Sequence, residues 1–354
     1  MSDRLMVATR KGLFTLTRGG SGWTTKLIGF SGTPVTNALR RNGTVYAALN
    51  DGHFGPKLHR SDDDGRHWRE IAPPAFPAEA AGAPSLFQIW ALDDGGAGRP
   101  ARLWIGGIPA GLFRSDDGGE SWQLMSSLWD VPERARWFGG GYDAAGIHSV
   151  SPDPRDPSRV LIAISSGGVW ETRDDGVTWA ALGKGLVAPY VPPEQAEDPA
   201  VQDPHRVSRC AAAPDVMWMQ HHAGMYRSTD AGAHWTRLTP PCDDFGFAVA
   251  AHPRDAQTAW FVPAIKDECR MPRDGALAVT RTKDGGKSWQ VLRQGLPQHD
   301  AYDLIYRHGL DVDTSGERLA MGSTTGALWT SDDAGESWRL VNAHLPPIYA
   351  LRFI

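Results

Sequence analysis

The chain has 354 residues, with 36 lysines and arginines, 41 aspartates and glutamates, and a hydrophobic share of 41%. Its charges nearly balance and are dispersed along the sequence, which makes nucleic acid and membrane surfaces poor candidate partners. No stretch approaches the roughly 18 apolar residues that span a bilayer, and the 40 glycines and 15 tryptophans point to a repeated structure.

The first segment, residues 1–12, passes from two charged residues directly into a strand-like run at residues 5–8. It contains no apolar signal core and no small-residue cleavage site. The three cysteines, Cys210, Cys242 and Cys269, cannot all pair with one another, and none has a CxxC spacing. These features predict a protein of a reducing compartment, the cytoplasm.

Six segments then follow the pattern Ser/Thr-x-Asp-x-Gly-x-x-Trp, and a decayed seventh copy keeps the tryptophan and a glycine-rich approach to it. In chain order they are residues 16–23 (the decayed copy), 61–68, 115–122, 172–179, 228–235, 282–289 and 331–338. Successive tryptophans are 45, 54, 57, 56, 54 and 49 residues apart, by subtraction of their numbers. This spacing is typical of the blades of a β-propeller.

Each copy lies between two short alternating strands, so we interpret it as a hairpin turn. Its aspartate is expected to accept backbone N–H bonds within the turn, and its glycine to adopt the positive φ that a tight turn demands. The tryptophan is expected to pack into the seam between neighbouring sheets. Because an active site needs one asymmetric constellation, turns that recur around the whole chain predict a structural role.

Two further strands precede each hairpin, as at residues 309–313 and 318–322 before the strand at 326–330, so four strands per blade are expected. Residues 5–8 fit a second strand, and residues 348–354 fit a spare innermost strand. We therefore predict an all-β, seven-bladed β-propeller with Asp-box turns, formed as a single domain by residues 1–354. The C-terminal strand would complete the first blade and remove an open sheet edge.

The six turns resemble the Asp-box, or BNR, repeat of sialidases, sortilin-type receptor domains, some xyloglucan-degrading enzymes and the photosystem II assembly factor. The segments GIHSVSPDPRDP, QDPHRV, MQHHAGMYRSTDAG, VPAIKDECRMP and YDLIYRHGLDVD are similar to those of a large bacterial group of sialidase-like, WD40-YVTN-BNR-like repeat proteins. The resemblance covers essentially the whole chain and implies the fold. Function has to be argued from the site, because this fold hosts catalysts, receptors and scaffolds.

In a propeller, the loops that enter the innermost strands and those that join the second and third strands converge at the axis. These loops hold seven of the 12 histidines: His53, His148, His205, His221, His222, His299 and His308. Because the charge of histidine changes near neutral pH, this bias predicts an axial site for proton transfer, metal ligation or anion binding. The long loops at residues 125–146 and 185–207 are expected to act as lids or binding elements.

The expected ligand is a small polar or anionic molecule. The candidate catalytic residues are His148, His205, His222, Glu268, His308 and Tyr302. The candidate ligand-binding residues are Arg10, Asn50, His53, Arg206, His221, Lys266, Arg270 and Arg307. Adjacent residues of an extended backbone point to opposite faces, so at most one of His221 and His222 should face the axis, and we prefer His222.

A divalent transition metal is a possible cofactor. Neutral imidazoles of His148, His205 and His222 with the carboxylate of Glu268 would suit zinc, iron or manganese. No short ligand spacing such as HExxH accompanies them. Cys269 is interpreted as a small buried residue or, alternatively, as a nucleophile whose base partner is not identified.

Three functions remain open. The first is an enzyme of the hydrolase or lyase type with the axial site just described. The second is a non-catalytic scaffold that binds a protein partner through a charged face. The third is a sialidase-like glycosidase with Tyr302 or Tyr306 beside Glu268, although the Phe-Arg-Ile-Pro segment of sialidases is absent and residues 7–12 stand in its place.

Overall fold

The computed structural model describes residues 1–20, 22–78, 84–96 and 98–354. The described chain is almost entirely β-structure and forms two compact units. Unit 1 consists of Met1–Gly32 with His205–Ile354, and unit 2 consists of Thr33–Pro204. In the part of the chain described, no helix has the length and apolar character needed to cross a membrane.

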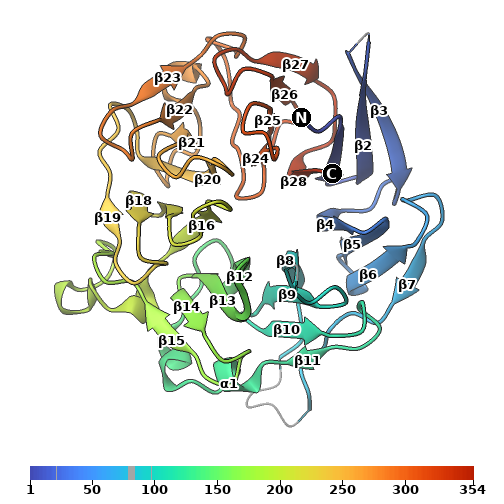
Figure 1. The fold of residues 1–354 in the computed structure, drawn as a ribbon, viewed down its shortest axis with the longest axis vertical. Coiled ribbons are helices and arrows are strands. Elements are labelled where there is room, and N and C mark those ends of the chain that lie inside the picture. The colour runs from blue at the N-terminus through green and yellow to red at the C-terminus, as the bar shows by residue number, and fades with distance from the viewer. Residues whose placement is uncertain (21, 79–83, 97) are drawn as a thin grey trace. The chain divides into compact units, whose positions relative to one another are not determined.

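Unit 1 contains four antiparallel sheets of four strands, in the orders β28-β1-β2-β3, β16-β17-β18-β19, β20-β21-β22-β23 and β24-β25-β26-β27 (Figure 1). The bounds are β1 (Arg4–Thr9), β2 (Gly12–Gly19), β3 (Gly22–Gly29), β16 (Pro204–Arg209), β17 (Met217–His221), β18 (Gly224–Ser228), β19 (Thr236–Arg237), β20 (Phe245–Ala251), β21 (Ala259–Ala264), β22 (Val279–Thr282), β23 (Gln290–Leu292), β24 (Leu310–Val312), β25 (Leu319–Gly322), β26 (Leu328–Ser331), β27 (Arg339–Asn342) and β28 (Ile348–Phe353), with one short 3-10 helix, η4 (Arg273–Gly275).

Unit 2 contains three antiparallel sheets, in the orders β4-β5-β6-β7, β11-β10-β9-β8 and β12-β13-β14-β15. The bounds are β4 (Val35–Arg41), β5 (Thr44–Asp51), β6 (Gly55–Ser61), β7 (Arg69–Ile71), β8 (Gln88–Asp94), β9 (Leu103–Ile108), β10 (Leu112–Ser115), β11 (Gln123–Leu124), β12 (Gly146–Asp153), β13 (Asp156–Ser165), β14 (Gly168–Thr172) and β15 (Ala180–Leu182), with the short helices α1 (Ser126–Trp129), η1 (Pro132–Arg136), η2 (Pro193–Gln195) and η3 (Pro199–Val201).

The seven sheets are the blades of an all-β, seven-bladed β-propeller, which confirms the predicted fold class. The first blade is completed by the C-terminal strand, because β28 pairs antiparallel with β1 in a register that places Leu5 opposite Phe353 and Val7 opposite Leu351. Apolar side chains of both strands are buried in one core cluster. The assignment of residues 1–354 to a single domain stays a prediction.

The Asp-box turns have the chemistry expected from their residues. In the copy at residues 172–179, Thr178 donates to the Asp174 carboxylate from its backbone N–H (2.9 Å) and its hydroxyl (2.6 Å). These bonds hold the pKa of Asp174 down, at about 2. Gly176 has a φ of +88° and donates its N–H to the Thr172 hydroxyl, and Trp179 packs, partly buried, on a core cluster. In the decayed copy, residue 21 lies outside the described residues.

Four of the boxes are preceded by an arginine that reaches the following sheet. Each guanidinium donates to a backbone carbonyl there: Arg60 to Gly118 (3.2 Å), Arg114 to Asp175 (3.0 Å), Arg227 to Ala256 (3.1 Å) and Arg281 to Ala334 (2.6 Å). Within each unit these arginines therefore tie consecutive blades together. The sequence shows the same signal, an arginine directly before the Ser or Thr of the motif, but we did not predict its role.

Candidate functional site

His205 lies at the start of β16 in unit 1 and is almost fully buried. Its ring stacks on Phe247 of β20, with ring centres 4.4 Å apart and an interplanar angle of 15°. Its Nδ1 lies 2.6 Å from the backbone oxygen of Gly246. Because a carbonyl only accepts, Nδ1 carries the proton of the neutral ring and Nε2 carries the lone pair. This tautomer suits a base or a ligand acting through Nε2.

His222 joins His205 from the turn between β17 and β18. The two rings meet edge to face at 5.4 Å, and Phe245 contacts the rings of His205 at 5.6 Å and His222 at 5.7 Å. The neighbouring His221 is fully buried, accepts the N–H of Ala223 at Nδ1 (3.0 Å) and contacts the ring of Tyr226. Of the two adjacent histidines, His222 therefore belongs to the group around His205, and His221 packs within its own sheet.

Two arginines approach the same aromatic ring. The guanidinium carbons of Arg270 and Arg307 lie 5.3 and 5.0 Å from the centre of Phe247, within the range of a cation–π contact. Arg270 is exposed and is also bonded to Asp267, whereas Arg307 is buried. Two positive charges beside a histidine and apolar rings suit an anionic group. We call His205, His222, Phe245, Phe247, Arg270 and Arg307 the His205 cluster.

The other candidates of unit 1 have different surroundings. Glu268 is 76% exposed and pairs with Lys266 at 3.5 Å. Tyr302 is 65% exposed. His308 is buried beside β28, where its backbone oxygen accepts the N–H of Leu351. Arg10 is exposed in the turn between β1 and β2, and Arg206 lies partly buried on β16.

The candidates of unit 2 are held by contacts of that unit. His148, on β12, is fully buried, and its Nε2–H donates to the Pro204 oxygen (2.7 Å) while its Nδ1 accepts from the Ser149 hydroxyl (3.0 Å). These bonds favour a structural role for His148. Asn50 donates to Gln88 Oε1 at 3.2 Å, and His53 is exposed.

The four-ligand metal set stays a prediction, because His148 belongs to unit 2 and the other three residues to unit 1. The structure brings His205 and His222 together in unit 1. Within residues 1–20, 22–78, 84–96 and 98–354, neither His148 nor Glu268 belongs to a group of three or more His, Cys, Asp or Glu side chains close enough to share an ion.

Asp311, on β24, is a carboxylic acid that the sequence analysis missed. Its Oδ2 accepts the N–H of Phe353 at 2.8 Å, so it joins the last blade to β28. Burial raises its pKa to about 6, although the bond from Phe353 and the positive charges of Arg352 and Arg206 act in the opposite direction. Its only sequence signal is its place in the strand at residues 309–313.

The raised pKa of Asp311 predicts a pH dependence of stability. The folded protein binds this proton more tightly than the unfolded chain, so the stabilisation is complete below the ordinary pKa of 3.8 and is lost as the pH rises through about 6. Asp311→Asn keeps an acceptor for Phe353 but cannot ionise. We expect it to raise the free energy of unfolding near pH 8 by at most ~3 kcal/mol, and to change it little near pH 4. Chemical denaturation at both pH values tests this, and equal effects at both would contradict it.

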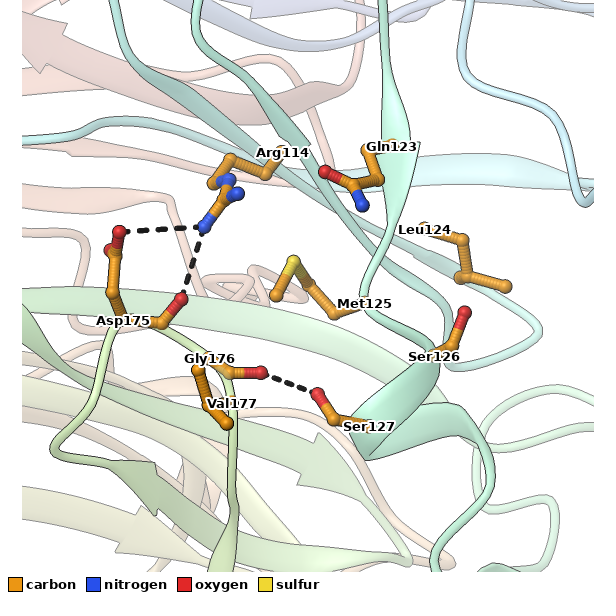
Figure 2. Close-up of a pocket in the computed structure, with 9 residues that line it drawn as sticks. All are labelled: Arg114, Gln123, Leu124, Met125, Ser126, Ser127, Asp175, Gly176 and Val177. Carbon is orange, nitrogen blue, oxygen red and sulfur yellow. Dashed lines mark hydrogen bonds and ion pairs between the residues drawn. The ribbon is translucent and has the colours of Figure 1, made fainter.

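One surface cavity lies away from all these residues. It has a volume of about 260 Å³ and is lined by Arg114, Gln123, Leu124, Met125, Ser126, Ser127, Asp175, Gly176 and Val177 (Figure 2). Figure 2 shows Arg114 bonded to Asp175 and Ser127 bonded to the Gly176 oxygen. Its polar groups therefore serve the Asp-box turn and the tie between two sheets of unit 2.

The fold and its turns together define an Asp-box β-propeller, and comparisons with known proteins agree with this. The family model of the BNR/Asp-box repeat matches residues 113–124. The oligoxyloglucan-reducing end-specific xyloglucanase of Emericella nidulans is 23% identical over 270 residues, which are 67% of this chain and 30% of that protein. A sialidase of Bacteroides fragilis is 26% identical over 232 residues, which are 54% of this chain and 39% of that protein. The chain thus spans well under half the length of these curated relatives.

Solved structures show the same fold. An ancestral GH74 enzyme aligns with a TM-score of 0.61 and 17% identity, covering 87% of this chain and 37% of that one. YCF48 bound to D1 peptide aligns with a TM-score of 0.54 and 14% identity, covering 88% of this chain and 83% of that one. At these identities the likeness carries the fold and nothing further.

Proposed function

We propose that the chain is a carbohydrate-active enzyme of the glycoside-hydrolase type that binds an anionic sugar at the His205 cluster. The observation that carries this proposal is the stacking of His205 on Phe247, a ring that two arginines also contact. The xyloglucanase and sialidase among the relatives support a glycan as the substrate class.

The chemistry of the cluster fits a carboxylate-bearing sugar. Arg270 and Arg307 would make charge-assisted hydrogen bonds to the carboxylate, and the aromatic rings would exclude water around it. His205, with its proton held on Nδ1 by Gly246, would exchange a proton with the substrate through Nε2. His222, whose ring contacts that of His205, would influence the proton affinity of His205 through its own charge.

Both hydrolysis and elimination are compatible with this arrangement, since each needs a proton-transfer group and stabilisation of negative charge. Of the two tyrosines considered for a sialidase-like reaction, Tyr306 has its ring 6.5 Å from that of Phe247. In a sialidase-like reaction, this tyrosine would be the nucleophile.

The three free cysteines support our further proposal of a reducing, cytoplasmic compartment.

The test measures turnover of uronate-containing, sialylated and neutral oligosaccharides by the full chain. Arg270→Ala and Arg307→Ala are expected to lower kcat/KM for anionic substrates about 10- to 100-fold, the loss of a charge-assisted bond. Formation of a conjugated double bond would identify elimination, and new reducing ends alone would identify hydrolysis. Arg339→Ala, an exposed arginine of β27, is the matched control.

Two results would overturn the proposal. One is the absence of turnover with every glycan class in the unmodified protein. The other is an equal loss in the Arg339→Ala control, which would show that net charge rather than position matters. Since Arg307 is buried and its loss threatens folding, the exposed Arg270 provides the variant that keeps the test decisive.

A further inference from the structure

Unit 2 concentrates the exposed aromatic side chains. Of the six phenylalanines and tyrosines that are exposed among the described residues, five lie in unit 2: Phe54, Phe87, Phe138, Tyr142 and Tyr190. Tyr302 is the sixth. The five come from connections between strands, outside the β-strands themselves. Where exposed aromatic side chains form a contiguous patch, they mark an interaction surface.

Three aromatic rings of this region form one contiguous group. Phe87 directly precedes β8, Trp90 lies within β8, and Tyr142 lies in the loop before β12. The ring centre of Tyr142 lies 5.8 Å from that of Phe87 and 5.4 Å from that of Trp90. Phe87 is 54% exposed and Tyr142 39%, so solvent reaches both rings. We call Phe87, Trp90 and Tyr142 the ring platform.

Neutral polar groups border the ring platform. Gln88 Oε1 accepts from the Tyr142 hydroxyl (3.4 Å) and from Asn50 Nδ2 (3.2 Å). These contacts fix two amide groups and a hydroxyl beside the rings, and none of them involves a charge. Pyranose rings present an apolar C–H face and a rim of hydroxyls that both donate and accept, which complements aromatic faces with neutral hydrogen-bonding groups at their edge.

The loop that carries Tyr142 is fixed in place. The N–H of Phe138 donates to the Ser166 oxygen at 3.1 Å, and Gly140 approaches the same serine so closely that a Cβ there would lie 2.7 Å from its Oγ. Only glycine permits this approach without a shift. The long loop at residues 125–146 therefore presents Tyr142 in a defined position, which reduces the entropy cost of binding.

We propose that the ring platform binds uncharged pyranose units of an oligosaccharide. The choice of a sugar as occupant rests on the proposed function. Amide and hydroxyl groups at the platform edge distinguish it from a surface that takes the apolar side chains of a peptide.

Calorimetric titration of the full chain tests the proposal, with cellohexaose and neutral xyloglucan oligosaccharides as probes. Phe87→Ala and Tyr142→Ala are each expected to weaken binding at least about 10-fold, as lost stacking does. Tyr142→Phe should weaken binding less, because it keeps the ring. Gly139→Ala should weaken it by displacing the loop while all contact residues remain, because a Cβ at Gly139 would collide with the backbone oxygen of Tyr142. Leu340→Ala, a large exposed side chain of β27, is the control.

The outcomes separate this inference from the proposed enzyme activity, because binding is measured directly and without turnover. Failure of both probes to bind the unmodified protein, or equal weakening by Leu340→Ala, overturns the ring platform and leaves the enzyme proposal standing. Binding that depends on Phe87 and Tyr142, in a protein that cleaves no glycan, supports the ring platform and overturns the enzyme proposal. If an apolar peptide binds and neither neutral sugar does, the choice of a sugar as occupant is overturned.

Discussion

Removal of residues 348–354 is expected to abolish stable folding of the first blade. Strand β28 forms the ladder with β1, and its Ile348 and Leu351 are buried with Leu5 and Val7. Loss of two buried aliphatic side chains costs about 2–5 kcal/mol each, which is comparable with the whole stability of a typical domain. The deletion also leaves the edge of β1 unpaired, so we expect aggregation in addition to a lower unfolding temperature.

Thermal unfolding and size-exclusion chromatography measure these effects. The double variant Ile348→Ala with Leu351→Ala keeps the strand backbone and removes only packing, so it separates the two causes. We expect it to be destabilised but soluble, whereas the deleted chain should aggregate. A deleted chain that stays monomeric and unfolds at the normal temperature would show that β28 is dispensable.

The sequence predicts the blades well because their determinants are local. Within each Asp box, aspartate, glycine and tryptophan act within eight residues, as the bonds around Asp174 illustrate. Closure by β28 was also predictable, since a chain that starts with a second strand needs an innermost strand from elsewhere. The arginine ties, as from Arg281 to Ala334, span two sheets and depend on a packing geometry that a single motif does not reveal.

The candidate site was predictable only at the level of its loops. His205 and Gly246 are 41 residues apart, and their contact depends on how two sheets pack. The sequence therefore identified His205, His222, Arg270 and Arg307 as residues of functional loops, but not the phenylalanine around which they gather. Asp311 was missed for a related reason. Its partial burial and its bond to Phe353 depend on β28, a strand that is distant in the sequence.

Only part of the ring platform was predictable from the sequence. Asn50 was a candidate ligand-binding residue, and Tyr142 lies in the loop at residues 125–146 that was expected to act as a lid or binding element, but Phe87 and Trp90 were not singled out. Apolar residues near a strand usually pack in the core, and the composition of a segment does not show which of them remain exposed. The exposure of Phe87 follows from its position just before β8.

His205→Gln is expected to lower kcat by roughly 100-fold or more while changing the unfolding temperature little. A glutamine amide retains a donor for the Gly246 oxygen and much of the side-chain volume over Phe247, but it cannot exchange a proton near neutral pH. The expected loss is that of a general acid or base. The pH–rate profile should also lose one limb, an effect that weakened packing alone would not produce.

His252→Gln provides the matched control for this substitution. His252 also stacks on an aromatic ring of unit 1, Trp260, at 5.7 Å, and its Nδ1 accepts backbone N–H bonds from Arg254 and Asp255. It lies outside the His205 cluster, so its loss should affect the free energy of unfolding more than turnover. If the two variants lose activity equally, or if His205→Gln keeps both limbs of the profile, His205 is a packing residue and the proton must move through another group.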